Sequence, residues 1–244
     1  MSPFILTVVM VAGLGAESGS PQGGEECRQS LEALESRQLE IRGTNPALAI
    51  DIQDWLERCG EVAPLHDRYL ARGLAAYSET QIGDRAKAQQ LSSDILSNCP
   101  AERDSCADSR SWAAYVKLFF DAQAEEPKDA HVALGAVEEE TGRRPNEVAA
   151  LWLRNEARLL YFIHLWNQLD DRSGAAAELL AVLETTNVHR FSRPFVHQRH
   201  NARIGLCMVA ISHPDVADRC LDQLPGAESE YSTLSNDEGR VQFW

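Results

Sequence analysis

The stretch from Tyr69 to Pro100 constrains the fold of this chain more than any other. It reads YLARGLAAYSETQIGDRAKAQQLSSDILSNCP, with apolar residues at helical spacing on both sides of Gly83 and Asp84. Pro100 prevents the second run from continuing as a helix. We therefore predict two short antiparallel helices joined at Gly83. Because such a pair cannot bury its apolar stripe alone, it requires neighbours of the same kind.

The rest of the chain repeats this pattern, and no strand pattern of consequence is present. The further predicted hairpins are Glu25–Arg42 with Pro46–Cys59, Ser109–Thr141, Glu147–Gln168 with Ala175–Thr186, and Pro194–Ile211 with Pro214–Leu224. They recur roughly every 35 to 45 residues, which predicts an all-α, solenoid-like stack of about five antiparallel helical hairpins. The helix over residues 147–168 is apolar around most of its circumference and is predicted to be the central one.

Residues 69–100 resemble a tetratricopeptide repeat. The shared positions are the small residues Ala76 and Ala88, the inter-helix Gly83-Asp84, and the terminal Pro100. Glu79 stands where the family has an aromatic residue near the turn, and Tyr77 lies two residues earlier. The resemblance is degenerate elsewhere in the chain. It implies a right-handed stack that binds protein or peptide partners.

The N-terminus, MSPFILTVVMVAGLGAES, has an apolar run from Phe4 to about Ala16. The run has the length of a secretory signal core and is too short to span a bilayer. No Lys or Arg precedes it, but Gly15 and Ala16 offer a cleavage site. We predict a cleaved signal over residues 1–16, with an uncleaved anchor or a buried segment of a cytosolic protein as alternatives. A flexible spacer (17–24), a helical-repeat domain (25–225) and a polar tail (226–244) are predicted to follow.

The six cysteines help to decide between an exported and a cytosolic protein. In an antiparallel hairpin, residues that face each other are centred on the turn, and this predicts sequential pairing. The predicted disulfides are Cys27–Cys59, Cys99–Cys106 and Cys207–Cys220. The first pair is centred on Gly43 and the third on the break before Pro214, while the second flanks a short loop. Disulfides predict a periplasmic or secreted protein, whereas six reduced thiols would indicate the cytosol.

The net charge of −14 argues against nucleic acid as a partner. Residues 188–206 reverse this balance, since they hold four arginines and three histidines and no acidic residue. These residues are Arg190, Arg193, Arg199 and Arg203 with His189, His197 and His200. Because guanidinium groups bind carboxylates bidentately, the arginines are predicted to form a groove for an acidic peptide or carboxylate. The alternative is that they pair with the acidic helices around them.

Other polar residues lie on the helix of the fourth hairpin. Asn155 and Arg158 are predicted to contact a partner, with ordinary surface polarity as the alternative. His164 is predicted to be a hydrogen-bonded core residue. His197 and His200 supply only two imidazoles, short of the three or four ligands that zinc requires, so no metal and no cofactor are predicted.

No nucleophile elbow, phosphate loop or paired-carboxylate motif is present in the sequence. The leading prediction is an exported, non-catalytic helical-repeat scaffold that binds a protein or peptide, with no stable membrane insertion after signal cleavage. One alternative is a metal-dependent or hydrolytic enzyme that uses the His/Arg segment 189–203. A second is a structural subunit of envelope assembly.

Overall fold

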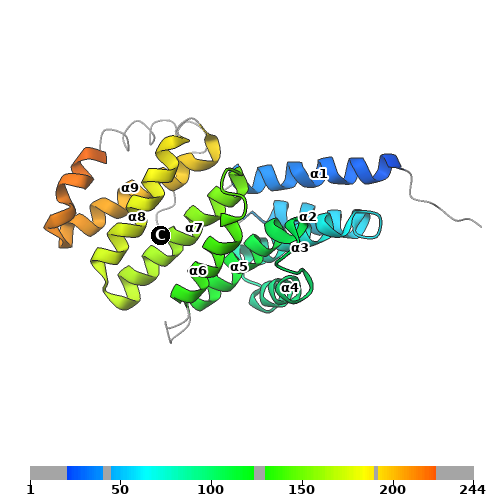
Figure 1. Ribbon diagram of the computed structural model, residues 1–244, viewed down its shortest axis with the longest axis horizontal. Helices are drawn as coiled ribbons and strands as arrows, with labels where there is room; N and C mark the ends of the chain where they lie inside the picture. Colours follow the sequence, from blue (N-terminus) through cyan, green and yellow to red (C-terminus); the bar gives the residue numbers. More distant parts are fainter. Residues whose placement is uncertain (1–20, 41–44, 124–129, 190–191, 224–244) are drawn as a thin grey trace, which may run out of the picture.

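A computed structural model describes residues 21–40, 45–123, 130–189 and 192–223 (Figure 1). The regular secondary structure of these residues is entirely helical. The α-helices are α1 (Pro21–Glu40), α2 (Pro46–Cys59), α3 (Leu65–Ile82), α4 (Arg85–Asn98), α5 (Ala107–Asp121), α6 (Ala130–Gly142), α7 (Val148–His164), α8 (Arg172–Val188) and α9 (Arg193–Ser212). A π-helical turn, Leu165–Leu169, extends α7, and a 3₁₀ turn, Pro214–Val216, leads into a last helix at 217–223. The predicted all-α class is confirmed.

The helix boundaries follow the predicted breakers closely, with one correction. α1 begins at Pro21, so residues 21–24 are helical and not part of a flexible spacer. A proline is tolerated there because the first N–H groups of a helix have no intrahelical acceptor. The predicted signal at 1–16 and the tail at 226–244 lie outside the described residues.

The predicted turn between α3 and α4 is confirmed. Gly83 takes a left-handed conformation with φ of 97°, which a residue without Cβ adopts at low cost, and its N–H donates to Glu79 O at 3.0 Å. Asp84 then caps α4, where its side chain accepts from the Lys87 N–H at 3.1 Å.

Each helix packs on its neighbours in sequence, and the odd-numbered helices also pack on one another. α1 contacts α3, α3 contacts α5, α5 contacts α7, and α7 contacts α9. As predicted for the most apolar helix, α7 is surrounded by α5, α6, α8 and α9. α1 also reaches α9, where Arg193 lies 4.0 Å from Glu40.

The centre of the odd-numbered helices is aromatic. Tyr77 of α3, Trp112 of α5 and Trp152 of α7 lie with ring centroids 5.1 to 5.9 Å apart. All three side chains are buried. They therefore join three successive hairpins in one core, which a single hairpin could not form.

All three predicted disulfides are present, with Cα–Cα distances of 5.8, 5.6 and 4.8 Å. Cys27–Cys59 joins α1 to α2, Cys99–Cys106 joins the end of α4 to the start of α5, and Cys207–Cys220 joins α9 to the last helix. Such bonds persist in oxidising compartments outside the cytosol. Within the described residues, no helix is both long and apolar enough to cross a membrane.

Two glycines provide a test of the contact between α3 and α5. A Cβ at Gly73 would lie 2.9 Å from Trp112 Cβ and 3.3 Å from Ser109 O, whereas a Cβ at Gly135 of α6 would meet nothing within 4 Å. We expect Gly73→Ala to lower the free energy of unfolding by about 1–3 kcal/mol, because α3 must move away from α5. Gly135→Ala should raise it by about 0.5–1 kcal/mol through helix propensity. Urea unfolding monitored by circular dichroism measures both; equal effects would contradict the close approach.

Candidate functional site

The predicted His/Arg segment forms the end of α8 and most of α9, and Arg190 lies outside the described residues. Arg199 is 3% exposed and donates from Nη1 to Thr186 O at 2.8 Å. Thr186 lies in the last turn of α8, where carbonyl groups lack the usual donor four residues on, and its oxygen also accepts from the His189 N–H at 3.2 Å. Arg199 therefore adds a second, buried donor to the C-terminal end of α8.

The other predicted arginines reach the surface and contact different parts of the fold. Arg193 lies beside Glu40 of α1, and Arg203 Nε donates to Gln223 Oε1 at 3.3 Å. Arg158 Nη2 donates to Glu138 Oε1 of α6 at 2.6 Å. The pairs of Arg193 and Arg158 with glutamates agree with the alternative in which arginines bind acidic helices of the same chain.

Asn155 is fully buried between α7 and α9. Its amide donates to Gln198 Oε1 at 3.1 Å, and Gln198 in turn donates to Trp152 O at 2.9 Å and Glu156 Oε1 at 3.0 Å. These buried hydrogen bonds fix the register of α9 on α7, because a shifted helix would leave the amides unpaired. The structure thus places Asn155 in the core.

The histidines also divide into buried and half-buried side chains. His164 is 2% exposed and its Nδ1 donates to Ala122 O at 3.2 Å, which confirms the predicted core histidine. His200 is buried, while His189 and His197 are half-buried. Over the described ranges, no group of three or more His, Cys, Asp or Glu side chains is arranged to hold a metal ion.

A second set of charged residues, absent from the sequence prediction, gathers around Arg144 in the connection from α6 to α7. Its Nη1 donates to Asp108 Oδ2 of α5 at 2.8 Å and to Glu147 Oε2 at 3.1 Å. Its Nη2 donates to Asp104 O at 2.7 Å. Together with Glu35 of α1, the side chains of Asp108, Arg144 and Glu147 are called the Arg144 cluster here.

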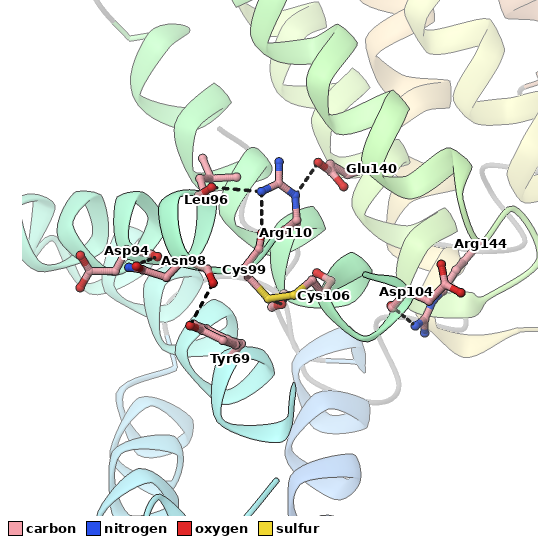
Figure 2. Close-up of a disulfide and its surroundings, with 11 residues drawn as sticks. Tyr69, Asp94, Leu96, Asn98, Cys99, Asp104, Cys106, Arg110, Glu140 and Arg144 are labelled. Carbon is pink, nitrogen blue, oxygen red and sulfur yellow. Dashed lines mark hydrogen bonds and ion pairs between the residues drawn. A yellow bond between two sulfur atoms is a disulfide. The ribbon is translucent and has the colours of Figure 1, made fainter. Parts of the chain in front are cut away.

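The disulfide loop presents Asp104 to this cluster. Figure 2 shows Arg144 beside the Asp104 carbonyl, toward the Cys106 end of the disulfide loop. At the Cys99 end, Arg110 donates to Leu96 O at 3.1 Å and Cys99 O at 2.9 Å, and pairs with Glu140 at 2.7 Å (Figure 2). Two arginines therefore hold the loop from opposite sides.

Glu35 lies on the inner side of the cluster. Its Oε1 lies 3.4 Å from Trp112 Nε1, which donates to it, and it makes no ion pair with any described residue. Burial and the nearby Asp108 carboxylate raise the pKa of Glu35 to about 7. Burial also raises the pKa of Asp108, against the opposing effect of Arg144. The cluster therefore holds more carboxylate than its one guanidinium neutralises, and Glu35 keeps its proton up to near neutral pH.

Sequence reasoning missed this cluster because its four members come from three separate parts of the chain: α1, α5 and the connection from α6 to α7. Glu35 looks like any exposed acid in α1, and Asp108 and Glu147 look like ordinary acids at helix starts. One signal was available: Glu35 lies four residues after Leu31 and one after Leu34, at the edge of the apolar stripe of α1. That position gives its carboxyl partial burial.

The comparisons with known proteins give no family. The chain matches no protein-family model, no curated protein and no solved structure.

Arg144 provides a test of the cluster, with the adjacent Arg143 as a matched control. Arg144→Gln should lower the free energy of unfolding by about 1–3 kcal/mol at pH 7.5, because Asp108 and Glu147 lose their cation. The loss should be smaller at pH 5, where the remaining carboxyls take up protons. Arg143 lies 3.8 Å from the exposed Glu139 and 3.5 Å from the buried Glu140, which keeps its shorter pair with Arg110 at 2.7 Å, so Arg143→Gln should cost less, at most about 1 kcal/mol. Denaturant unfolding at both pH values measures this; equal losses for the two variants would contradict the cluster.

Proposed function

We propose that this protein is an exported, non-catalytic helical-repeat scaffold that binds a protein or peptide partner. The observation that carries the proposal is the unbroken layer of odd-numbered helices, in which α1, α3, α5, α7 and α9 each pack on the next. A layer of this kind presents side chains from successive hairpins side by side, which suits an extended partner. A right-handed, tetratricopeptide-like solenoid is the form of stack that we propose.

Rigidity supports this function. Disulfides join α1 to α2 and α9 to the last helix, a third closes the connection from α4 to α5, and the central helices share one aromatic core. A surface that is already ordered before binding loses little conformational entropy in the complex. The same disulfides support a periplasmic or secreted location.

The surface arginines of α9 are the proposed contacts for the partner. The side chain of Arg193 is 66% exposed and that of Glu40 is 47% exposed, and an ion pair this open contributes little to stability. A carboxylate of the partner can therefore replace Glu40 at low cost. Arg203 lies on the same helix and is half-buried. An acidic peptide segment fits this pair best.

The test is binding by charge-reversal variants. Wild-type protein, Arg193→Glu/Arg203→Glu and the control Arg58→Glu would each be used to capture partners from the extracytoplasmic fraction of the native cells. Arg58 is exposed on α2 and, among the described residues, donates within its own helix, to Asp54 O at 3.3 Å. The captured partner would then be purified and titrated by calorimetry.

We expect saturable binding to wild type and Arg58→Glu, and binding weakened about tenfold or more by the double variant. Thermal melting of each variant checks that the fold is retained. Equal affinity in all three would contradict the assignment to α9. A wild-type protein with no saturable partner would contradict the scaffold function itself.

A further inference from the structure

The two halves of α1 are attached to the rest of the protein differently. The N-terminal half is held covalently by Cys27–Cys59, and Trp55 Nε1 of α2 donates to Cys27 O at 2.8 Å and to Ser30 Oγ at 3.0 Å. Leu31 is 1% exposed at the end of this half. This part of the helix cannot leave α2 while the disulfide is intact.

The C-terminal half is held only by side-chain contacts. Leu34 and Leu39 are buried, and Gln38 Oε1 accepts from Ser78 Oγ of α3 at 3.4 Å. Arg37 pairs with Asp51 of α2 at 2.8 Å, with both side chains more than 40% exposed. Ion pairs this exposed contribute little.

Glu35 lies in the middle of this half and faces the other members of the Arg144 cluster. Trp112 and Asp108 face it from α5, and Arg144 and Glu147 face it from the connection before α7. His66, at the start of α3, lies near Asp108 and pairs with Asp67 at 2.8 Å. On α1 itself, the exposed Glu32 pairs with Arg28 at 3.3 Å and points elsewhere. The one guanidinium in this set is already bound by Asp108, Glu147 and Asp104 O.

We propose that the C-terminal half of α1 is a pH-sensitive latch over the aromatic core, closed when the Glu35 carboxyl is protonated and loosened when it ionises. A neutral Glu35 can sit beside the acidic side chains of the cluster and accept from Trp112. An ionised Glu35 adds a third negative charge beside the carboxylates of Asp108 and Glu147. The one guanidinium near them, that of Arg144, is already bound to both. Release of residues 34–40 into water relieves that repulsion.

The direction follows from the two states of Glu35. Its pKa is about 7 in the closed latch and near its ordinary value of 4.5 when released. The closed state therefore binds more protons between these values, and stability of closure is lost as pH rises through them. Opening becomes about tenfold more favourable for each pH unit in this range. Below pH 4.5 and above pH 7 this carboxyl adds no further dependence.

Opening would uncover Trp112, which is fully buried beneath α1 and is joined to Tyr77 and Trp152. The disulfide keeps the released segment tethered, so reclosure needs no search by a free chain. The latch thus couples external pH to exposure of the central aromatic side chains. It does not depend on which partner the protein binds.

Amide hydrogen exchange followed by mass spectrometry tests the latch on the full, disulfide-bonded chain. After correction for intrinsic exchange, residues 34–40 should lose about fortyfold of protection between pH 5 and pH 7, which follows from a pKa of about 7 in the closed latch and 4.5 in the released one. Residues 21–30, held by the disulfide, should change much less and serve as an internal control. Glu35→Gln, a neutral isostere, should keep residues 34–40 protected at both pH values.

Two further variants make the outcome decisive. Glu32→Gln, three residues away on the exposed side of α1, should behave as wild type. Asp108→Asn should reduce the loss of protection between pH 5 and pH 7, because the Asp108 carboxylate helps raise the pKa of Glu35. A wild-type segment with constant protection would overturn the latch. So would a pH response that survives in Glu35→Gln or is unchanged in Asp108→Asn.

Discussion

The contact of Tyr77, Trp112 and Trp152 is the interaction on which the centre of the fold depends. Tyr77 meets Trp112 edge to face, with an interplanar angle of 71°, and aromatic side chains bury more apolar surface than any others. The absence of a Cβ at Gly73 lets α3 approach the α5 backbone closely enough for this contact. Three hairpins that are each too small to be stable alone thereby share a single core.

Much of this arrangement could be predicted from sequence because it depends on local rules. Apolar spacing gave the helices, and prolines and Gly83 gave their ends. Two of the disulfides followed from the symmetry of an antiparallel hairpin, in which residues equally far from the turn must meet, and Cys99–Cys106 followed from the shortness of the loop that it closes. The start of α1 could not be predicted, because the glycines and proline of residues 21–24 are typical of a spacer, although Pro21 also suits the first turn of a helix.

The site could be predicted far less well, because exposure and pairing are set by tertiary contacts. Arg199 and Arg203 are four residues apart on one helix, yet one is buried at the end of α8 and the other is half-buried beside Gln223. Nothing in a linear pattern distinguishes them. Glu35 shows the same dependence on tertiary contacts. The pKa of its carboxyl rises only because α5 and the α6–α7 connection bury it and bring Asp108 and Glu147 close.

The meeting of α1 with α9 affects how the protein is assembled. The three disulfides close over short separations of 32, 7 and 13 residues, so each can form as soon as the short segment between its cysteines has emerged. The neighbour that α1 finds in α9 arrives last, after the whole intervening chain. Oxidation can therefore proceed from one end to the other, while the docking of α1 on α9 waits until α9 has been synthesised, because it joins residues far apart in the sequence.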